Sequence, residues 1–175
     1  DRTARSDDRH RDPLAARFIA ATPFIVISSQ RADGGLDVSP RGDPPGFMKV
    51  LAPKTLAIPD RPGNRRMDTH TNLLTNPEVG IMCMIPGHDD VLRLSGKARM
   101  VSDDTLGETM VVNGHRPSLI LLITVDRLMC HCPKALMRSG LWTPDAWPDT
   151  ADVPTLGEMV KAHGQLADSL AQIDK

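Results

Sequence analysis

Aromatic side chains are scarce in this sequence. Its 175 residues include no tyrosine, three phenylalanines and two tryptophans. Surfaces that bind single-stranded nucleic acid stack its bases on aromatic rings, so such a surface is not expected. The formal net charge at pH 7 is −1, whereas a surface for the phosphate backbone of a duplex needs an excess of lysine and arginine. We therefore expect no nucleic-acid partner.

A long apolar run and a disulfide framework are also missing. The longest apolar run, residues 119–125, is far shorter than the roughly 20 residues that cross a bilayer. No signal peptide is recognisable. The three cysteines are an odd number, which fits a reducing compartment. We therefore expect a cytoplasmic protein that does not interact with membranes.

Three fingerprints of common enzyme folds are absent. The chain has no G-x-G-x-x-G turn, no G-x-x-x-x-G-K loop and no G-x-S-x-G elbow. It therefore offers no support for Rossmann binding of a dinucleotide, for P-loop chemistry or for a hydrolase of the nucleophile-elbow type.

Cysteine and histidine, the preferred ligands of zinc, occur together at Cys130-His131-Cys132. Side chains alternate along a strand, so the two thiols share one face and the imidazole lies on the other. We interpret this run as two buried thiols beside an oriented histidine, and we predict no metal site. Asp68 and His70 are likewise more typical of surface or capping groups than of acid–base catalysis.

Short alternating apolar segments begin at Pro23 and indicate a β-rich domain. Turn signals such as Asp33-Gly34 separate several of them, and few helices intervene, which is typical of an antiparallel barrel rather than a doubly wound sheet. We predict a mainly β fold with peripheral helices and six or seven strands. The candidate strands are residues 24–28, 36–39, 48–52, 55–58, 78–85, 91–101 and 118–132, and the candidate helices are 13–20, 67–74, 102 to about 112, and 133–138.

The chain is predicted to have three parts. Residues 1–12 are almost all charged or polar and lack periodicity, which indicates a flexible N-terminal segment. Residues 13–148 form the barrel domain. Residues 149–175 contain an amphipathic stretch, 154–173, which predicts a C-terminal helix packed on the barrel or on a partner subunit.

Two arginine-containing loops, residues 39–43 and 60–66, follow predicted strands, and each carries proline and glycine. The second loop leads into the helix predicted at 67–74. Unpaired backbone N–H groups at a helix start favour an anion, and the forked donors of arginine match phosphate oxygens two at a time. These loops indicate a phosphate-bearing ligand; the alternative is two solvated basic turns that bind nothing.

A second basic feature follows the last predicted strand. Lys134, Arg138 and Trp142 recur at four-residue intervals, so on a continuous helix they would form one stripe. Such a stripe suits one wall of a site for a planar anionic ligand. The alternative is an exposed basic face beside a structural tryptophan.

Several of these segments, by their order and spacing, resemble the pyridoxamine 5'-phosphate oxidase-like family of FMN-binding split barrels. They are most similar to a bacterial subgroup of flavoproteins that shares the Pro-Arg-Gly-Asp and Arg-Pro-Gly-Asn-Arg-Arg sequences. The matching segments are residues 38–43, 60–66, 76–85, 92–98 and 132–142.

The resemblance implies an antiparallel split β-barrel, a homodimer, and FMN bound in the groove between the subunits. By position, Asn64, Arg65 and Arg66 are similar to the family's polar and basic run at the FMN phosphate. Arg41, after the second strand, would complete this anion site.

The resemblance assigns further positions to the cofactor, namely Ser39, Asp60, Arg93, Arg138 and Trp142, and we add Lys134 from the stripe described above. The first two correspond to strand ends near the ribityl chain or the ring edge, and Arg93 to a polar side chain of a strand. Arg138 and Trp142 would come from the partner subunit and meet the flavin ring. FMN carries a phosphate at one end and a ring that becomes more negative on reduction at the other, so its site needs cations at both ends.

The implied activity is that of an FMN-dependent oxidoreductase with an unknown substrate, a small molecule or NAD(P)H, and no residue is assigned as a catalytic acid or base. The family members that form pyridoxal phosphate end in a strand with a tryptophan and an arginine-rich motif. This chain instead ends in the predicted helix at 154–173, so that particular oxidation is not expected. The alternatives are a non-catalytic flavin carrier or sensor, a haem or deazaflavin protein on the same barrel, and a structural module with a basic surface.

Overall fold

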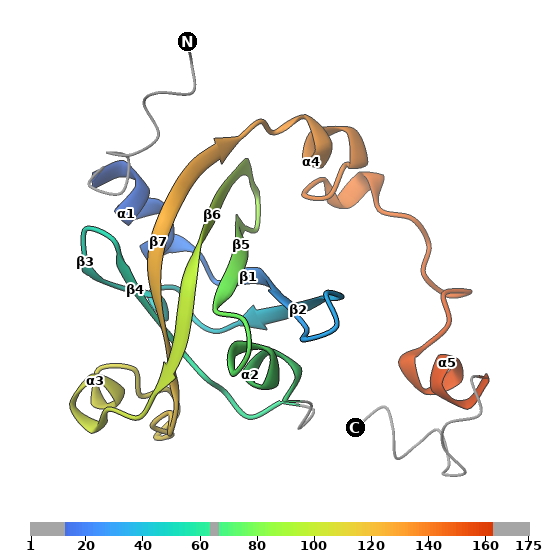
Figure 1. Cartoon of the computed structure of the whole chain (residues 1–175). Coiled ribbons are helices and arrows are strands. Elements are labelled where there is room, and N and C mark those ends of the chain that lie inside the picture. Colours follow the sequence, from blue (N-terminus) through green and yellow to red (C-terminus); the bar gives the residue numbers. More distant parts are fainter. Residues whose placement is uncertain (1–12, 64–66, 163–175) are drawn as a thin grey trace. The chain divides into compact units, whose positions relative to one another are not determined.

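Seven antiparallel strands form one sheet in the computed structural model, which describes residues 13–63 and 67–162 (Figure 1). Within these residues the strand order is β2-β1-β5-β6-β7-β4-β3. The strands are β1 (Phe24–Gln30), β2 (Leu36–Gly42), β3 (Lys49–Ala52), β4 (Thr55–Pro59), β5 (Glu78–Ile85), β6 (His88–Val101) and β7 (Ile120–His131). The predicted mainly β, antiparallel fold is therefore confirmed.

Short helices precede, separate and follow the strands along the chain, as predicted. They are α1 (Pro13–Ala21), α2 (Asp68–Leu73), α3 (Asp104–Glu108), α4 (Lys134–Ser139) and α5 (Leu156–Ala162), with a 3₁₀ turn, η2, at Pro144–Ala146. The side chain of Asp103 caps α3, because its carboxylate accepts a hydrogen bond from Leu106 N at 2.9 Å. No helix in the part of the chain that the structure describes is long and apolar enough to cross a membrane.

The chain divides after Trp142 into two compact units. In the second unit, α5 begins with a reciprocal cap: Thr155 N donates to Glu158 Oε2 at 2.8 Å, and Glu158 N donates to Thr155 Oγ1 at 3.2 Å. The helix predicted at 154–173 is therefore observed from Leu156 to Ala162. Its remainder and the predicted N-terminal segment lie outside the described residues, and the predicted boundaries of the three parts remain predictions.

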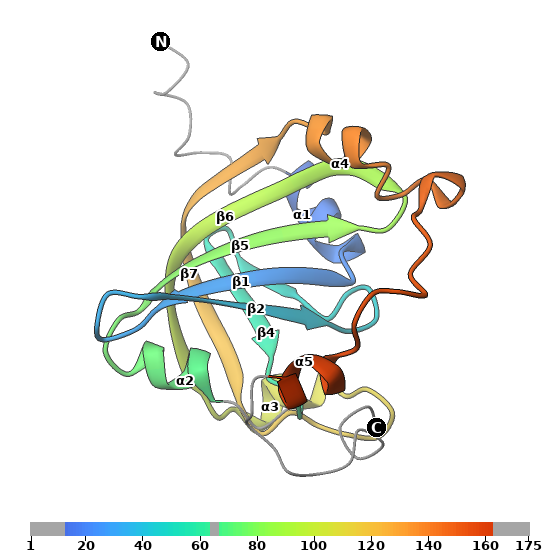
Figure 2. The same cartoon turned by 90° about the vertical axis from the view of Figure 1, so that its right-hand side faces the viewer.

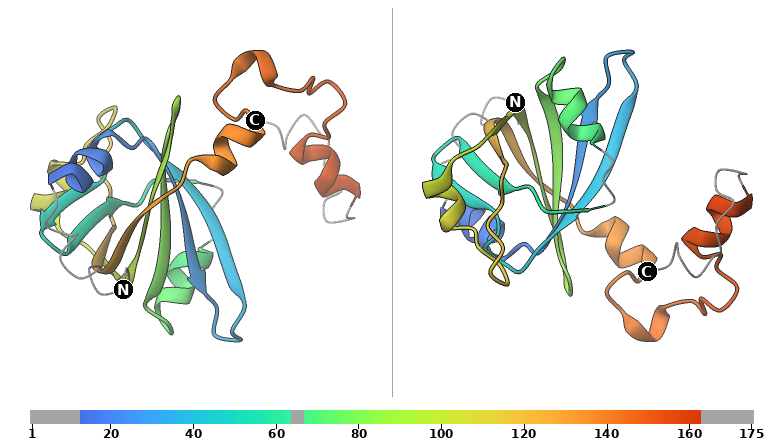
Figure 3. Two further views of the ribbon diagram at one scale, coloured as in Figure 1. Left: turned by 90° about the horizontal axis from the view of Figure 1, so that it is seen from above. Right: turned by 90° about the horizontal axis from the view of Figure 1, so that it is seen from below.

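The sheet of the first unit encloses an apolar core because side chains alternate along its strands. In β1, Ile25 and Ile27 are buried on the inner face, whereas Val26 and Ser28 point outward. Ile19 of α1 joins the same core. Figures 2 and 3 show that the sheet curves until β4 lies behind β1 and β2, so a single sheet surrounds its own interior.

A buried amide attaches α2 to two strands. Asn72 Nδ2 donates to Ser29 Oγ of β1 at 2.9 Å and to Asp37 Oδ2 of β2 at 2.7 Å. Asn72 and Ser29 are both buried, so loss of either group would leave a buried polar atom without its partner. This one side chain therefore holds α2 against the edge of the sheet.

The cysteines differ from expectation. Cys83 on β5 is buried, and burial raises the pKa of its thiol to about 12, which keeps it protonated. Cys130 and Cys132 are exposed, so their interpretation as buried thiols is wrong: they lie at the end of β7, beyond the last buried residue of that strand, Leu128. Among the described residues, no three potential ligands from His, Cys, Asp and Glu gather as a metal site would require.

A close backbone approach explains one glycine of β6. The pairing of β6 with β7 shifts register between Ser95 and Gly96. A Cβ atom on Gly96 would lie 2.0 Å from the backbone oxygen of Thr124, which cannot move without breaking the strand pairing. Only glycine fits this irregular point of the sheet.

We expect Gly96→Ala to lower the free energy of unfolding by about 1–3 kcal/mol, because overpacking against backbone forces the two strands apart. Urea unfolding followed by circular dichroism measures this change. Gly42→Ala is the matched control: its added Cβ would have Pro23 O as its nearest neighbour, at 3.5 Å, so the expected change is within about 0.5 kcal/mol. Equal unfolding midpoints for the two variants would contradict the steric explanation.

Candidate functional site

A pocket opens where β2 meets the end of β4 and the start of α2. Its lining includes Ser39 and Arg41 of β2, Asp60 directly after β4, and Thr69 and His70 of α2. The two arginine-containing loops predicted from the sequence therefore border one pocket, although they belong to strands far apart in the sheet order.

The carboxylate of Asp60 lies between two nitrogen-bearing side chains. Arg41 Nη1 donates to Asp60 Oδ1 at 3.3 Å, and His70 Nε2 lies 3.2 Å from Asp60 Oδ2. Arg41 is 27% exposed, and among the described residues its other guanidinium nitrogens make no hydrogen bond. The carboxylate therefore holds Arg41 by one nitrogen and leaves the other N–H groups of the fork for a ligand.

No sequence pattern marked His70 as part of this site. Its side chain is only 14% exposed. Both ring nitrogens are buried, and neither makes a hydrogen bond to a described residue. Nε2 is close enough to Asp60 Oδ2 for an ion pair, but the contact does not have hydrogen-bond geometry. The prediction of a surface or capping group is therefore wrong, because the attachment of α2 to β1 and β2 buries the ring. Buried polar atoms nearly always have a partner, which a ligand in this pocket could supply.

Arg61, in contrast, has a structural role. Its Nε donates to Asp43 Oδ2 at 2.6 Å, Nη2 to Met110 O at 2.7 Å, and Nη1 to His115 O at 3.3 Å. All three nitrogens are engaged, and Asp43 belongs to the first arginine-containing loop. Arg61 therefore joins the two loops to each other and to the segment after α3, and is not available to a ligand.

Asn64, Arg65 and Arg66, the predicted phosphate contacts, lie outside the described residues. The described residues on either side of them in the sequence, Gly63 and Met67, both line the pocket. The assignment of these three residues to the phosphate remains a prediction.

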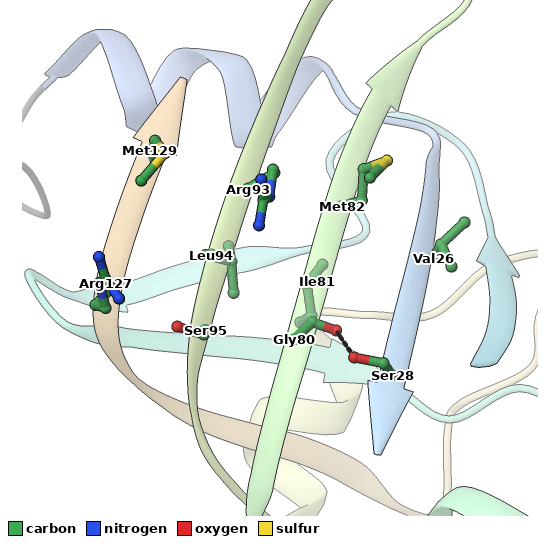
Figure 4. Close-up of a pocket in the computed structure, with 10 residues that line it drawn as sticks. All are labelled: Val26, Ser28, Gly80, Ile81, Met82, Arg93, Leu94, Ser95, Arg127 and Met129. Atoms are coloured by element: carbon green, nitrogen blue, oxygen red, sulfur yellow. Dashed lines mark hydrogen bonds between the residues drawn. The ribbon is translucent and has the colours of Figure 1, made fainter. Parts of the chain in front are cut away.

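Arg93 is separated from Arg41 by the sheet. Arg41 pairs with Ile25, whose side chain lies on the inner face, and directly opposed residues share a face. Arg93 instead lines a groove on the outer face with Met82 and Met129, its partners on β5 and β7 (Figure 4). Within the described chain, Arg93 and Arg41 therefore do not belong to one pocket.

The predicted stripe after β7 is interrupted. Lys134 and Arg138 are exposed on α4, but the helix ends at Gly140, which has a left-handed φ of 61°, and Leu141 N then donates to Leu136 O at 3.2 Å. Trp142 follows this turn, so the helix predicted at 133–138 ends before it, and the three residues do not lie on one continuous helix. The indole Nε1 of Trp142 is buried and has no hydrogen-bond partner among the described residues.

A family model described as pyridoxamine 5'-phosphate oxidase matches residues 12–128, which include all seven strands except the end of β7. The chain belongs to the pyridoxamine 5'-phosphate oxidase family. The resemblance drawn from the sequence motifs is thereby confirmed. A search of curated proteins gives no match.

Solved structures share the fold of this family member. A variant of HupZ from Group A Streptococcus has a TM-score of 0.54 at 15% identity, and the match covers 69% of this chain and 99% of HupZ. A conserved hypothetical protein from Mycobacterium tuberculosis has a TM-score of 0.52 at 12% identity over 72% of this chain and 87% of the other. A protein from Lactobacillus delbrueckii, provisionally named a pyridoxamine 5'-phosphate oxidase, has a TM-score of 0.50 at 16% identity over 69% and 94%. At such identities the likeness establishes the split-barrel fold.

We expect Arg61→Ala to lower the free energy of unfolding by about 3 kcal/mol, because it leaves the Asp43 carboxylate, 9% exposed, and two backbone carbonyls without their donor. Arg99→Ala removes an exposed arginine of β6 and should change stability by no more than about 0.5 kcal/mol. Urea unfolding of both variants measures the difference. If Arg61→Ala were as stable as Arg99→Ala, its structural role would be refuted.

Proposed function

We propose that this member of the pyridoxamine 5'-phosphate oxidase family is an FMN-dependent oxidoreductase that acts on a small molecule. Proteins of the family typically bind a flavin or haem. The observation that carries the proposal is the pocket beside β2, which offers the guanidinium of Arg41, the side chain of Ser39 and the buried imidazole of His70. This is a polar set of donors suited to the phosphate and ribityl oxygens of FMN.

The described lining of the pocket has no excess of positive charge, because it includes Asp37, Asp60 and Asp68 beside Arg41 and Arg61. Asp37 accepts from Asn72 and lies 3.9 Å from Arg31, and Asp60 is shared by Arg41 and His70. A phosphate dianion would therefore need further positive charge. Arg65 and Arg66, whose sequence neighbours Gly63 and Met67 line the pocket, are the residues proposed to supply it, with Asn64 as an additional donor.

FMN, when bound, supplies hydride and electron transfer. The protein's own residues would bind and orient it: Arg41 and the run Asn64–Arg66 at the phosphate, and Ser39 and Asp60 along the ribityl chain. Lys134, Arg138 and Trp142 are proposed for the ring end, where a cation would stabilise the charge of the reduced ring.

A homodimer is proposed because apolar side chains beside the pocket are exposed. Val38 and Met67, which line it, are 67% and 54% exposed, and Leu36 on the same strand is 70% exposed. Apolar residues beside a polar pocket suit a surface that a second copy covers. The second copy would then provide the wall for the flavin ring.

The alternative proposal is a flavin carrier or sensor without turnover. In the described residues the pocket contains one buried titratable ring, His70, and its neighbouring carboxylate is occupied by Arg41. Oxidation of NADH or NADPH with a panel of acceptors separates the two proposals, because a carrier is reduced once at most whereas an enzyme turns over repeatedly.

We expect the purified protein to bind FMN, seen by its absorbance spectrum and by mass of the released chromophore. Arg65→Ala with Arg66→Ala should weaken FMN binding on the order of 1.5–3 kcal/mol for each arginine, and Arg41→Gln by a similar amount, since each removes a charged hydrogen bond. Arg99→Gln, on an exposed part of β6, is the control and should leave the affinity unchanged. Unaltered affinity in the double variant would refute the phosphate assignment, and a protein without affinity for FMN would refute the function.

We expect flavin to be lost on dilution if the ring lies between two subunits, because dissociation of the dimer removes one wall of the site. Analytical ultracentrifugation with detection at the flavin absorbance measures the subunit state and the bound flavin together. Val38→Asp and Leu36→Asp should both favour the monomer. A monomer that retains one FMN per chain would contradict the shared site.

A further inference from the structure

Two thiols that the proposed function does not use lie at the end of β7, where the chain leaves the sheet for α4 (Figure 1). Cys130 is the penultimate residue of β7, and Cys132 follows the last residue of the strand. Both side chains are exposed, and neither takes part in a disulfide bond. We call these two residues the thiol pair. Their exposure is unusual, because cysteine is among the most often buried residue types.

Both thiols belong to the face of β7 that continues the apolar core. Cys130 pairs with the buried Leu92 of β6, and directly opposed residues share a face. Cys132 is two residues further along, and it precedes Pro133, which favours an extended backbone for the residue before it. The alternation of the strand therefore carries through to Cys132. The thiol pair lies on one face, beyond the last buried residue of the strand, Leu128.

His131 lies between the two thiols in the sequence but on the opposite face. Its Nδ1 is 3.4 Å from Nη1 of Arg93, which lines the outer face of the sheet. Among the described residues, no three side chains of His, Cys, Asp and Glu gather as a metal site would require. The thiol pair therefore offers two sulfur ligands in this part of the chain, which does not suit zinc and its usual four.

The spacing of the thiol pair decides between a disulfide and a bound ion. An extended strand advances about 3.3–3.4 Å per residue, so the two Cα atoms are about 6.7 Å apart. This value is at the upper end of the range of about 4.4–6.8 Å that a disulfide spans, and the two sulfurs must then come within about 2 Å of each other. Two metal–thiolate bonds of about 2.3 Å in a line instead place the sulfurs about 4.6 Å apart. Parallel side chains at this spacing reach that separation by leaning toward each other.

We propose that the thiol pair binds one soft monovalent metal ion, Cu(I), between the sulfurs of Cys130 and Cys132. Thiolates are the protein ligands that select Cu(I), and this ion is stable with two ligands in a line. On binding, the two S–H groups release their protons to water, two Cu–S bonds form, and copper keeps its oxidation state. Neither thiol lines the pocket of the proposed flavin site, so the inference does not depend on flavin binding.

The test is a titration of the full chain with Cu(I), kept reduced by ascorbate, in competition with the coloured chelator bicinchoninate. The wild-type chain should bind one ion. Cys130→Ser and Cys132→Ser should each weaken Cu(I) binding by about a hundredfold or more, because a single thiolate loses the gain from binding at two points. Both substitutions are at exposed positions, so the fold should be retained, which circular dichroism checks.

Two control variants keep the thiol pair. Cys83→Ala removes the buried thiol of β5, and His131→Gln removes the exposed imidazole between the two ligands. Both should bind Cu(I) as the wild type does. An equal loss in His131→Gln, or unchanged affinity in the two serine variants, would overturn the proposal. A stoichiometry of one ion for two chains would also overturn it, since the ion would then join two copies.

A thiol count with a chromogenic disulfide reagent gives an independent readout. In the folded chain without copper, two thiols should react quickly and the third only after unfolding, because Cys83 is buried. One equivalent of Cu(I) should protect both exposed thiols. If they reacted as fast with copper as without it, the proposal would be refuted. Loss of both thiols to an internal disulfide in air would contradict the argument from their spacing.

Discussion

Two ion pairs hold together strands that the backbone leaves apart. β2 and β4 are separated by four strands in the sheet order, so no ladder joins them. Arg41 of β2 bonds to Asp60 after β4, and Arg61 of the following loop bonds to Asp43 at the end of the first loop. Side-chain charges thus connect the two sides of the split barrel where backbone hydrogen bonds do not. The pocket lies at this junction, so the contacts that support the fold also shape the candidate site.

The same junction explains why neighbouring arginines have different uses. Arg61 gives its nitrogens to Asp43 and two carbonyls, so it organises the loops. Arg41 has one such contact and lines the pocket. An arginine beside a phosphate must keep part of its fork available, and this distinction decides which of the two can serve a ligand.

The sheet also separates two sets of polar residues. Ser39 and Arg41 lie on the inner side of the edge strand β2, whereas Arg93 and Arg127 lie on the outer face of β6 and β7. The sheet therefore keeps the arginine of the candidate pocket apart from the two arginines of its outer face.

Local patterns were enough to predict most of the fold. The alternation of apolar residues in β5 predicted its bounds, Glu78–Ile85, without error. Turn glycines and the order of short strands predicted the antiparallel class. Both kinds of prediction work because periodicity and turn chemistry act between residues close in sequence. The two arginine-containing loops could also be selected as candidate ligand contacts, and the structure places both beside one pocket. What the sequence by itself determined was therefore the strands, their turns and the family. Only the tertiary structure decided that Asp60 joins Arg41 to His70, that Arg61 is structural, and that Arg93 faces away from them. Those facts depend on how far one sheet curves and on which face each side chain meets, and both are set by packing between residues distant in the chain.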